Sequence, residues 1–359
     1  MRKKLAISIQ IILMLSSCVT EDYFGKSPYG NIKSISVSNQ ASNSIISTED
    51  LTVSVEIPAG VDLTHIAIQS LEISTYATAD KAVGDILDLN TPGEITIIAE
   101  NGEEFVWQVN AYVASATPQL NNWDLNLWYK TPSDYYEPGE SASTTIWGTG
   151  NPGTQILNKL ATIPHDLGDG NLAAHLETLD NGKLAGTFGA PISAGSLYTG
   201  VFNPDKLDPS DPQAAIEFGT PFTGRPGQIR FKYSYIAGEE NKDKNGNALE
   251  YPDACDIYAI LELRLGGSTE RLATAWFRST EDQAELSSQT VDFVYGALGD
   301  EYPDYMKPTD HGYVSADSAT FVLPTHITFV ASSSFDGANF AGAIGSTLII
   351  DDVEMVYEE

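Results

Sequence analysis

The feature that most constrains the fold of this chain is a strict alternation of apolar and polar residues. Between residues 51 and 57 the apolar positions are Leu51, Val53, Val55 and Ile57. After an Asn101-Gly102 turn the same period returns in Phe105, Trp107, Val109, Ala111 and Val113. A period of two places side chains on alternate faces of a β-strand. Several short strands of this kind predict an immunoglobulin-type β-sandwich over residues 32–116, with Trp107 in its core.

The chain after Pro118 is also rich in strand-forming residues, and no segment shows a helical period for more than three turns. β-Branched and aromatic residues fill "QIRFKYSYI", "CDIYAILELRL", "RLATAWFRS", "TVDFVYG", "THITFVASS" and "STLIIDDVEMVY". Loops heavy in Gly, Pro, Asp and Asn separate them. About ten strands predict a jelly roll of two facing antiparallel sheets over residues 117–359. The predicted fold class is therefore all-β, with an Ig-like sandwich followed by a jelly-roll β-sandwich.

The N-terminus reads as a secretion signal that ends at a cysteine. Three basic residues at positions 2–4 precede an apolar run, Leu5–Leu15, which is too short to cross a bilayer. The sequence Leu15-Ser16-Ser17-Cys18 resembles the lipobox of bacterial lipoproteins. That resemblance implies a signal peptide over residues 1–17, acylation of Cys18 as a membrane anchor, and a tether over residues 18–31. The alternative is an ordinary secretion signal with an incidental cysteine.

Charge and cysteine content limit the partners of the exported chain. Removal of residues 1–17 leaves 16 basic residues against 49 acidic ones, a formal charge of −33. Such a surface repels nucleic acid and anionic lipid headgroups, so neutral polymers, cations and other proteins are the compatible partners. Glu21 and Asp22 resemble the acidic export signal of Bacteroidetes surface lipoproteins, which implies display on the outer face of the outer membrane. Cys255 lies in an apolar run, so we expect a buried thiol and no disulfide.

Ordered sequence blocks between residues 121 and 357 resemble the putative carbohydrate metabolism domain family of Bacteroidetes lipoproteins. The blocks are "NNWDLNLWYK", "IWGTGNPGT", "NLAAHLETL", "KLAGTFGAPISAGSLYTGVF", "EFGTPFTGRP", "FKYSY", "DACDIYAILEL" and "ASSSFDGANFAGAIGSTLIIDDVEMVY". The resemblance implies a jelly roll like that of carbohydrate-binding modules. The segments "DLTHIAIQSLEIS" and "LDLNTPGEITIIAENGEEFVWQV" resemble the Ig-like domain that follows the anchor in such proteins.

A glycan site needs exposed rings beside short polar side chains, because a sugar has an apolar face and a rim of hydroxyls. Trp276 and Arg278 share one face of a predicted strand and pair a ring with a fork of donors. The other candidates lie near residues 128–151 and in the loop "YPDYMKP", although strand tryptophans also serve as core. The full set of predicted glycan contacts is Trp128, Tyr129, Tyr135, Tyr136, Trp147, Asn151, Trp276, Arg278, Tyr302 and Tyr305.

A structural calcium ion is the candidate cofactor. In related jelly rolls it lies where the last strand crosses near the first, which implies Asp124 with Asp351 or Asp352. Calcium takes six to eight oxygen ligands, so carboxylates and backbone carbonyls suffice. The alternation places Asp351 and Asp352 on opposite faces, so only one of them can serve. A solvated pair of acids is the alternative.

Enzyme motifs are absent from the sequence: there is no Gly-x-Ser-x-Gly, no His-Glu-x-x-His and no Cys-x-x-Cys. We therefore expect a cell-surface lipoprotein that binds a polysaccharide or other glycan without turning it over. Two alternatives stay open. One is an adhesin or envelope-assembly protein that binds a protein partner through exposed aromatic residues. The other is a glycan-active enzyme, which needs two facing carboxyl groups in a groove.

Overall fold

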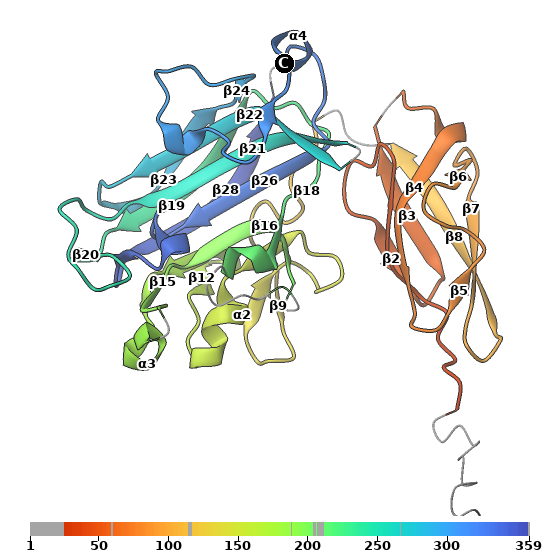
Figure 1. Ribbon diagram of the computed structural model, residues 1–359, viewed down its shortest axis with the longest axis horizontal. Coiled ribbons are helices and arrows are strands. Elements are labelled where there is room, and N and C mark those ends of the chain that lie inside the picture. The colour runs from red at the N-terminus through yellow and green to blue at the C-terminus, as the bar shows by residue number, and fades with distance from the viewer. Residues whose placement is uncertain are drawn as a thin grey trace, which may run out of the picture.

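The computed structural model describes residues 25–357, except for residues 59, 114–116, 188, 204, 205, 207–211 and 266. The described chain is built almost entirely of strands, in a smaller N-terminal unit and a larger C-terminal one (Figure 1). Its α-helices are single short turns: α2 (Asn151–Thr154), α3 (Gly182–Thr187) and α4 (Ala316–Ala319). The predicted all-β fold class is confirmed.

The N-terminal unit is a sandwich of two sheets. The smaller sheet has the order β1 (Ile32–Val37), β4 (Ile66–Ile73), β6 (Ile86–Leu87). The larger sheet has the order β2 (Ile45–Ser47), β3 (Thr52–Ile57), β8 (Glu104–Val113), β7 (Gly93–Ile98), β5 (Thr78–Ala79). The short η1 (Leu63–His65) precedes β4. Trp107 is fully buried, as predicted, and its indole N–H donates to the Gly30 carbonyl at 2.9 Å.

The C-terminal unit consists of two larger sheets that face each other. One has five antiparallel strands in the order β12 (Thr162–Gly168), β13 (Asn171–Glu177), β28 (Thr347–Val356), β19 (Gln228–Ile236), β23 (Gln283–Asp292). The other runs β11 (Trp147–Thr149), β16 (Ser196–Phe202), β26 (His326–Ser332), β21 (Cys255–Leu265), β22 (Ser268–Ser279), β24 (Val294–Tyr295). It is extended by β17 (Ile216–Phe218), β18 (Thr220–Pro221) and β25 (Gly312–Tyr313).

Short elements complete this unit at its edges. They are the hairpin of β9 (Trp128–Lys130) and β10 (Tyr136–Pro138), the pairs β14 (Leu179–Asp180) with β15 (Ile192–Ser193) and β20 (Asn241–Lys242) with β27 (Gly342–Ala343), and the 3₁₀ turns η2 (Gln155–Leu157), η4 (Pro212–Ala215), η5 (Asp304–Met306) and η6 (Gly337–Asn339). No helix in the described part of the chain is long and apolar enough to cross a membrane. The signal segment and Cys18 lie outside the described residues.

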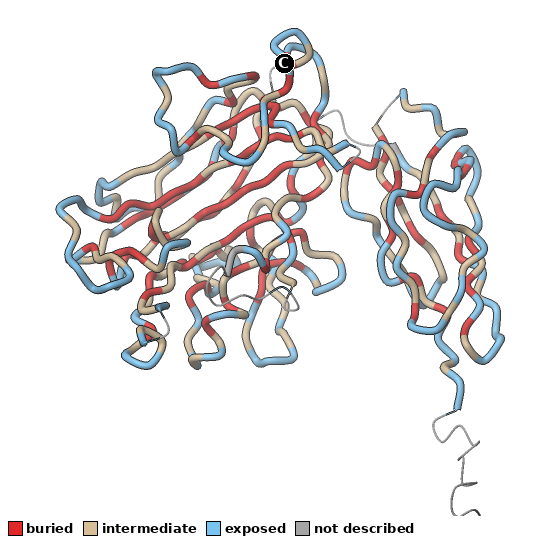
Figure 2. Tube along the Cα trace, viewed as in Figure 1, coloured by how far each residue is buried: buried red, intermediate tan, exposed pale blue. Residues whose placement is uncertain are grey.

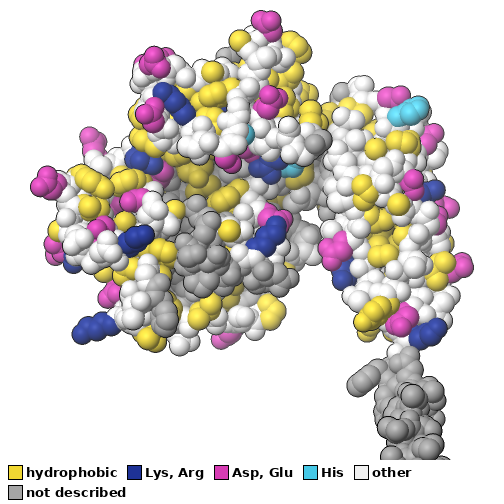
Figure 3. Space-filling model, viewed as in Figure 1, with side chains coloured by type: hydrophobic (Ala, Val, Ile, Leu, Met, Phe, Trp, Pro, Cys, Tyr) yellow, Lys and Arg dark blue, Asp and Glu magenta, His cyan; other side chains and the backbone are white. Residues whose placement is uncertain are grey.

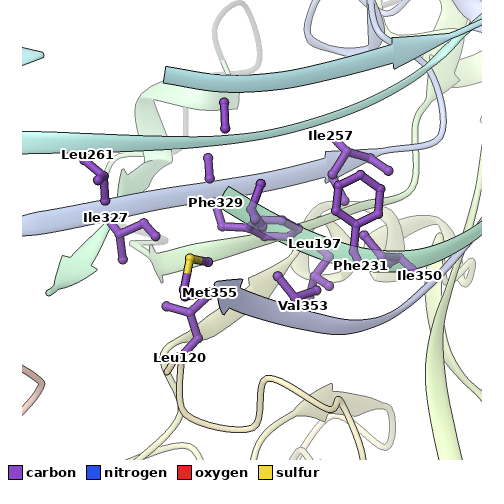
Figure 4. Packing of buried hydrophobic residues seen from close by; sticks show 14 of the residues in the cluster. Leu120, Leu197, Phe231, Ile257, Leu261, Ile327, Phe329, Ile350, Val353 and Met355 are labelled. Atoms are coloured by element: carbon purple, nitrogen blue, oxygen red, sulfur yellow. The ribbon is translucent and has the colours of Figure 1, made fainter. Parts of the chain in front are cut away.

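Each unit has its own hydrophobic core. In the larger unit, side chains of the two facing sheets meet: Leu197, Ile257 and Phe329 come from one sheet, and Phe231 and Ile350 from the other (Figure 4). Buried backbone runs along the middle of these strands, while the loops are exposed (Figure 2). Cys255 is buried in this core as a free thiol, as the sequence predicted. The two cores have no residue in common.

Truncation of a buried ring tests the core of the larger unit. Phe329 is fully buried and meets Trp147 edge-on, with 5.6 Å between ring centroids. We expect Phe329→Ala to lower the free energy of unfolding by about 3–5 kcal/mol, because it removes buried apolar surface and leaves a cavity. Urea denaturation measures the change. Phe321→Ala is the matched control, since Phe321 is 70% exposed, and equal losses in the two variants would contradict this account of the core.

Candidate functional site

The outer face of the larger sheet carries its side chains in rows, because the antiparallel register aligns four neighbouring strands. In β21 the inward residues Cys255 and Ile257 belong to the core, so Asp256 and Tyr258 point outward. Asp256 pairs with Ser332 of β26 on one side and with Arg278 of β22 on the other. Residues that are opposite each other in adjacent strands lie about 5 Å apart, so such positions form a continuous row.

The first row is polar. Ser196 of β16 is opposite Ser332, which is opposite Asp256, which is opposite Arg278. The guanidinium of Arg278 donates to both carboxylate oxygens of Asp256, at 3.0 and 2.8 Å. The indole N–H of Trp276 donates to the same carboxylate at 2.6 Å. Burial raises the pKa of Asp256, while the hydrogen bonds and charge of Arg278 act against that rise.

The second row lies one step along the strands and is mainly aromatic. It consists of Tyr198, Val330, Tyr258 and Trp276, again in strand order. Tyr258 stacks on Trp276 with 4.0 Å between ring centroids. Tyr198 lies against the backbone of Gly148, where a Cβ atom would stand 2.6 Å from the ring. Its hydroxyl donates to the Thr149 carbonyl at 3.2 Å. A glycine is therefore needed at position 148 for the ring to lie flat on the sheet.

Part of these rows forms the floor of a cavity of about 490 Å³: Ser196, Ser332 and Asp256 from the first row, and Tyr198, Val330 and Tyr258 from the second. Its walls come from the segment after β11, from α3 and β15, from β17, and from η6 and the residues beside it. On the face seen in Figure 3, hydrophobic side chains gather around the middle of the larger unit, and acidic side chains lie mostly toward its margins. The residues that line the cavity include Thr149, Thr154, Ile156, Leu157, Asn181, Ser193, Ser196, Tyr198, Phe202, Ile216, Phe218, Asp256, Tyr258, Val330, Ser332, Ser334, Phe335 and Phe340. We call it the sheet pocket.

Trp276 and Arg278 were predicted as a pair and Tyr305 separately, and the structure brings all three together behind one wall of the sheet pocket. Arg278 lies 3.8 Å from the centroid of the Tyr305 ring and 4.6 Å from that of Phe335. Tyr305 also meets Trp276 edge-on at 5.6 Å. A guanidinium between two rings gains cation–π attraction. These residues fix Asp256, Tyr258 and Phe335, which line the sheet pocket, but they are not themselves among the residues that line it.

Two predicted contacts are wrong because their side chains lie inside the protein. Trp147 is 3% exposed, and its indole N–H donates to the Asn121 carbonyl at 2.7 Å. Asn151 is fully buried and holds Thr162 through both ends of its amide, at 2.6 Å to the carbonyl and 3.0 Å to the N–H. Neither residue presents a face to a ligand.

The remaining predicted aromatic residues do not line the sheet pocket. Trp128, Tyr129 and Tyr136 belong to the strands of the β9–β10 hairpin, and Tyr135 directly precedes its second strand. Trp128 packs against the core, and its indole N–H donates to the Leu125 carbonyl at 2.8 Å. Tyr136 is the most exposed of them, at 44%. Tyr302 is partly buried near η5. Their contact with a glycan stays a prediction.

The sequence analysis missed the side chains that form the floor of the sheet pocket: Tyr198, Asp256, Tyr258, Ser332 and Phe335. One signal was present. Alternation around a buried Cys255 places Asp256 and Tyr258 on the opposite, outer face of the strand. A carboxylate and a tyrosine at outward positions of an otherwise apolar strand indicate that other segments pack over this face of the sheet. Buried polar groups need hydrogen-bond partners, and such segments supply them.

A buried carboxyl group lies beside the sheet pocket. Glu137 is 6% exposed, one of its oxygens accepts from the Thr149 hydroxyl at 2.8 Å, and the other has no donor in the described part of the chain. Burial raises the pKa of Glu137 to about 7. Burial, and to a lesser degree the charge of Glu137, raises the pKa of Tyr135 to about 12. Glu137 is therefore partly protonated near neutral pH.

The predicted calcium ligands take different roles. Asp352 forms an ion pair with Lys232 at 2.6 Å, and Asp124 accepts from the Asn126 amide at 3.0 Å. Asp351 is fully buried, with one oxygen 3.5 Å from the Asn171 amide and the other without a donor among the described residues. Burial and the neighbouring Asp352 raise the pKa of Asp351 to about 6.

An orphaned, buried carboxylate oxygen fits a hard cation, although the described residues offer no group of three His, Cys, Asp or Glu side chains around it. Asp352 is committed to Lys232, so Asp351 is the carboxylate of the predicted pair with a free oxygen. Calcium binding at Asp351 stays a prediction.

The fold is a jelly-roll β-sandwich with a cavity on the outer face of one sheet. Residues 121–356 match the family described as the Putative carbohydrate metabolism domain, and the chain belongs to this family. A search of curated proteins gives no match.

Two solved structures share the fold. A structure described as a putative glycoside hydrolase from Bacteroides thetaiotaomicron is 22% identical, covers 94% of this chain and 100% of its own, and has a TM-score of 0.58. One with the same description from Bacteroides vulgatus is 26% identical, covers 67% of this chain and 98% of its own, and has a TM-score of 0.52.

The raised pKa of Glu137 predicts a pH-dependent stability. Between pH 4.5 and about 7 the unfolded chain releases this proton while the folded chain retains it, so stability falls as pH rises through that window. We expect Glu137→Gln to raise the free energy of unfolding at pH 8 by on the order of 2 kcal/mol and to change it little at pH 4.5. Urea titrations at both pH values measure this. A difference that is the same at both would contradict the assignment.

A calcium ion bound at Asp351 would stabilise the folded protein, which gives a second stability test. We expect calcium to raise the Tm of the chelator-treated protein at pH 7, because a ligand that binds only the folded state stabilises it by mass action. Asp351→Asn should lose this increase, whereas Asp352→Asn should retain it. Thermal melts with calcium, with magnesium and with chelator alone provide the comparison. A Tm that calcium leaves unchanged would show that Asp351 is only a buried acid.

Proposed function

We propose that this chain binds a neutral glycan in the sheet pocket and acts as an accessory protein in polysaccharide capture. The observation that carries the proposal is the pair of rows on the pocket floor, where Ser196, Ser332 and Asp256 lie beside the partly buried ring of Tyr258. Rings beside short polar groups match the apolar face and hydroxyl rim of a sugar. Membership of a family named for carbohydrate metabolism supports the same ligand class.

The electrostatics of the site favour a neutral glycan. Among the described residues that line the sheet pocket, Asp256 is the one charged side chain, and Arg278 neutralises it. The whole chain carries a formal charge of −30, which repels uronates and sulfated sugars at a distance. The sheet pocket is concave, and a concave cavity suits a small ligand better than a protein partner, which favours a flat apolar patch.

The proposed setting is the outer face of a bacterial outer membrane. The Leu15-Ser16-Ser17-Cys18 sequence and the acidic residues after it support a lipid anchor with outward display. In this arrangement the N-terminal sandwich acts as a spacer between the anchor and the glycan-binding unit. Labelling of whole cells with an antibody, before and after protease shaving, tests the outward display.

A second candidate is glycan hydrolysis, because two structures of the same fold are described as putative glycoside hydrolases. Such an enzyme needs two carboxyl groups about 5–10 Å apart. The described lining supplies Asp256, and its two oxygens are engaged by Arg278. Glu137 bonds to β11, which is three strands from β21, a separation of roughly 14 Å at the usual strand spacing. This geometry supports binding better than hydrolysis.

Loss of a floor ring tests glycan binding directly. The chain from residue 19 is screened on an array of host, plant and microbial polysaccharides, and hits are measured by isothermal titration calorimetry. We expect Tyr258→Ala to weaken binding at least tenfold, because it removes the central ring of the aromatic row. Tyr76→Ala is the matched control, since Tyr76 is 75% exposed in the N-terminal unit.

Thermal melts establish that both tyrosine variants are folded. The proposal would be overturned if no polysaccharide on the array bound the protein, or if Tyr258→Ala and Tyr76→Ala bound with equal affinity.

A further inference from the structure

The lining of the sheet pocket changes character along strand β16. At its first residue, Ser196 lies in the polar row with Ser332 and Asp256. At its last residue, Phe202 is paired with Ile216 of β17. The two ends are six residue steps apart, which is roughly 20 Å at the usual rise of a strand. The cavity therefore has a polar end and an apolar end.

The apolar end is built from two separate segments. Phe202 is the last residue of β16, and Ile216 and Phe218 come from β17. Phe218 also meets Tyr198 of the floor edge-on, with 5.4 Å between ring centroids. The close approach of β17 to β16 depends on Gly200, whose added Cβ would stand 2.3 Å from the Glu217 carbonyl oxygen.

The lining residues that the end of β16 and β17 supply are Phe202, Ile216 and Phe218, and all three are apolar. At the other end, the Ser196 hydroxyl and the Asp256 carboxylate line the pocket. Sugar hydroxyls thus have polar side chains beside them at the polar end, whereas at the apolar end they would lose water without gaining a partner.

We infer that the ligand of the sheet pocket is an amphiphilic glycan: a neutral sugar that carries an alkyl, acyl or aryl group. The sugar lies over the row of Ser196, Ser332 and Asp256, and its apolar group lies between Phe202, Ile216 and Phe218. This inference rests on the proposed function and specifies the class of glycan. An unsubstituted polysaccharide would leave the apolar end filled with poorly bonded water, so the substituent gives a gain in affinity when that water is displaced.

Simple glycosides test the inference without knowledge of the natural glycan. The probes are n-octyl and methyl β-glycosides of glucose, galactose, mannose and xylose, with 1-octanol as the chain without a sugar. Calorimetry is run below the micellar concentration on the chain from residue 19. We expect at least one octyl glycoside to bind ten times or more tightly than its methyl counterpart and than 1-octanol.

A matched pair of isoleucine variants tests whether the octyl group binds at the apolar end of the pocket. Ile216 lines the pocket beside Phe202 and belongs to neither hydrophobic core, so Ile216→Asn leaves the cores intact. Ile344 is 45% exposed and is not among the lining residues, and Ile344→Asn is the control. We expect Ile216→Asn to weaken octyl glycoside binding at least threefold and to leave methyl glycoside binding unchanged. Ile344→Asn should change neither.

The failures of the two proposals are distinguishable. If methyl and octyl glycosides bind equally, or if array polysaccharides bind while every octyl glycoside is inert, the inference is overturned and glycan binding stands. If 1-octanol binds as tightly as the best octyl glycoside, the pocket takes an apolar chain without a sugar, and both proposals are overturned. Equal affinity of Ile216→Asn and Ile344→Asn for the octyl glycoside would also overturn the inference.

Discussion

The hydrogen-bond register across β16, β26, β21 and β22 is the constraint on which the site depends. Antiparallel pairing aligns one outward residue from each strand, so a polar row and an aromatic row lie side by side on one sheet. A slip of one residue in β21 would turn Asp256 and Tyr258 into the core and Cys255 and Ile257 outward. The hydrophobic core of the larger unit therefore fixes the register, and the register fixes the chemistry of the pocket floor.

The buried ion pair of Asp256 and Arg278 connects this floor to the loops around it. Removal of two charges from water is costly, and the pair is stable only when further hydrogen bonds and packing offset that cost. Here the Trp276 indole supplies the additional donor, and the rings of Tyr305 and Phe335 lie near the guanidinium. Through these contacts the residues beside η5 and η6 are held on the sheet. One salt bridge thus positions groups that are about eighty residues apart in the sequence.

Much of the architecture was predictable from the sequence because alternation is a local signal. The all-β class, the buried Trp107 and the buried Cys255 follow from the period of the apolar residues. The partnership of Trp276 with Arg278 follows from their spacing of two. Trp147 was not predictable in the same way, since β11 has three residues and alternation over so short a strand does not fix which side chain faces the core.

The pocket itself could not be predicted, because it depends on contacts between segments that are distant in the sequence. Phe202 and Ile216 become neighbours only when β17 pairs with β16, and no local sequence pattern predicts that pairing. For the tyrosines of the β9–β10 hairpin, partial exposure to solvent was predictable, because they lie in or beside a loop that contains Pro and Asp. Their position outside the cavity was not predictable, because it depends on how distant segments fold together.

The separation of the two cores has a consequence for how such proteins diversify. Because no buried side chain is shared between them, a change that loosens one core removes no packing contact from the other. The N-terminal sandwich is therefore free to drift in sequence, or to be exchanged for another module, while selection on the ligand acts on the larger unit alone.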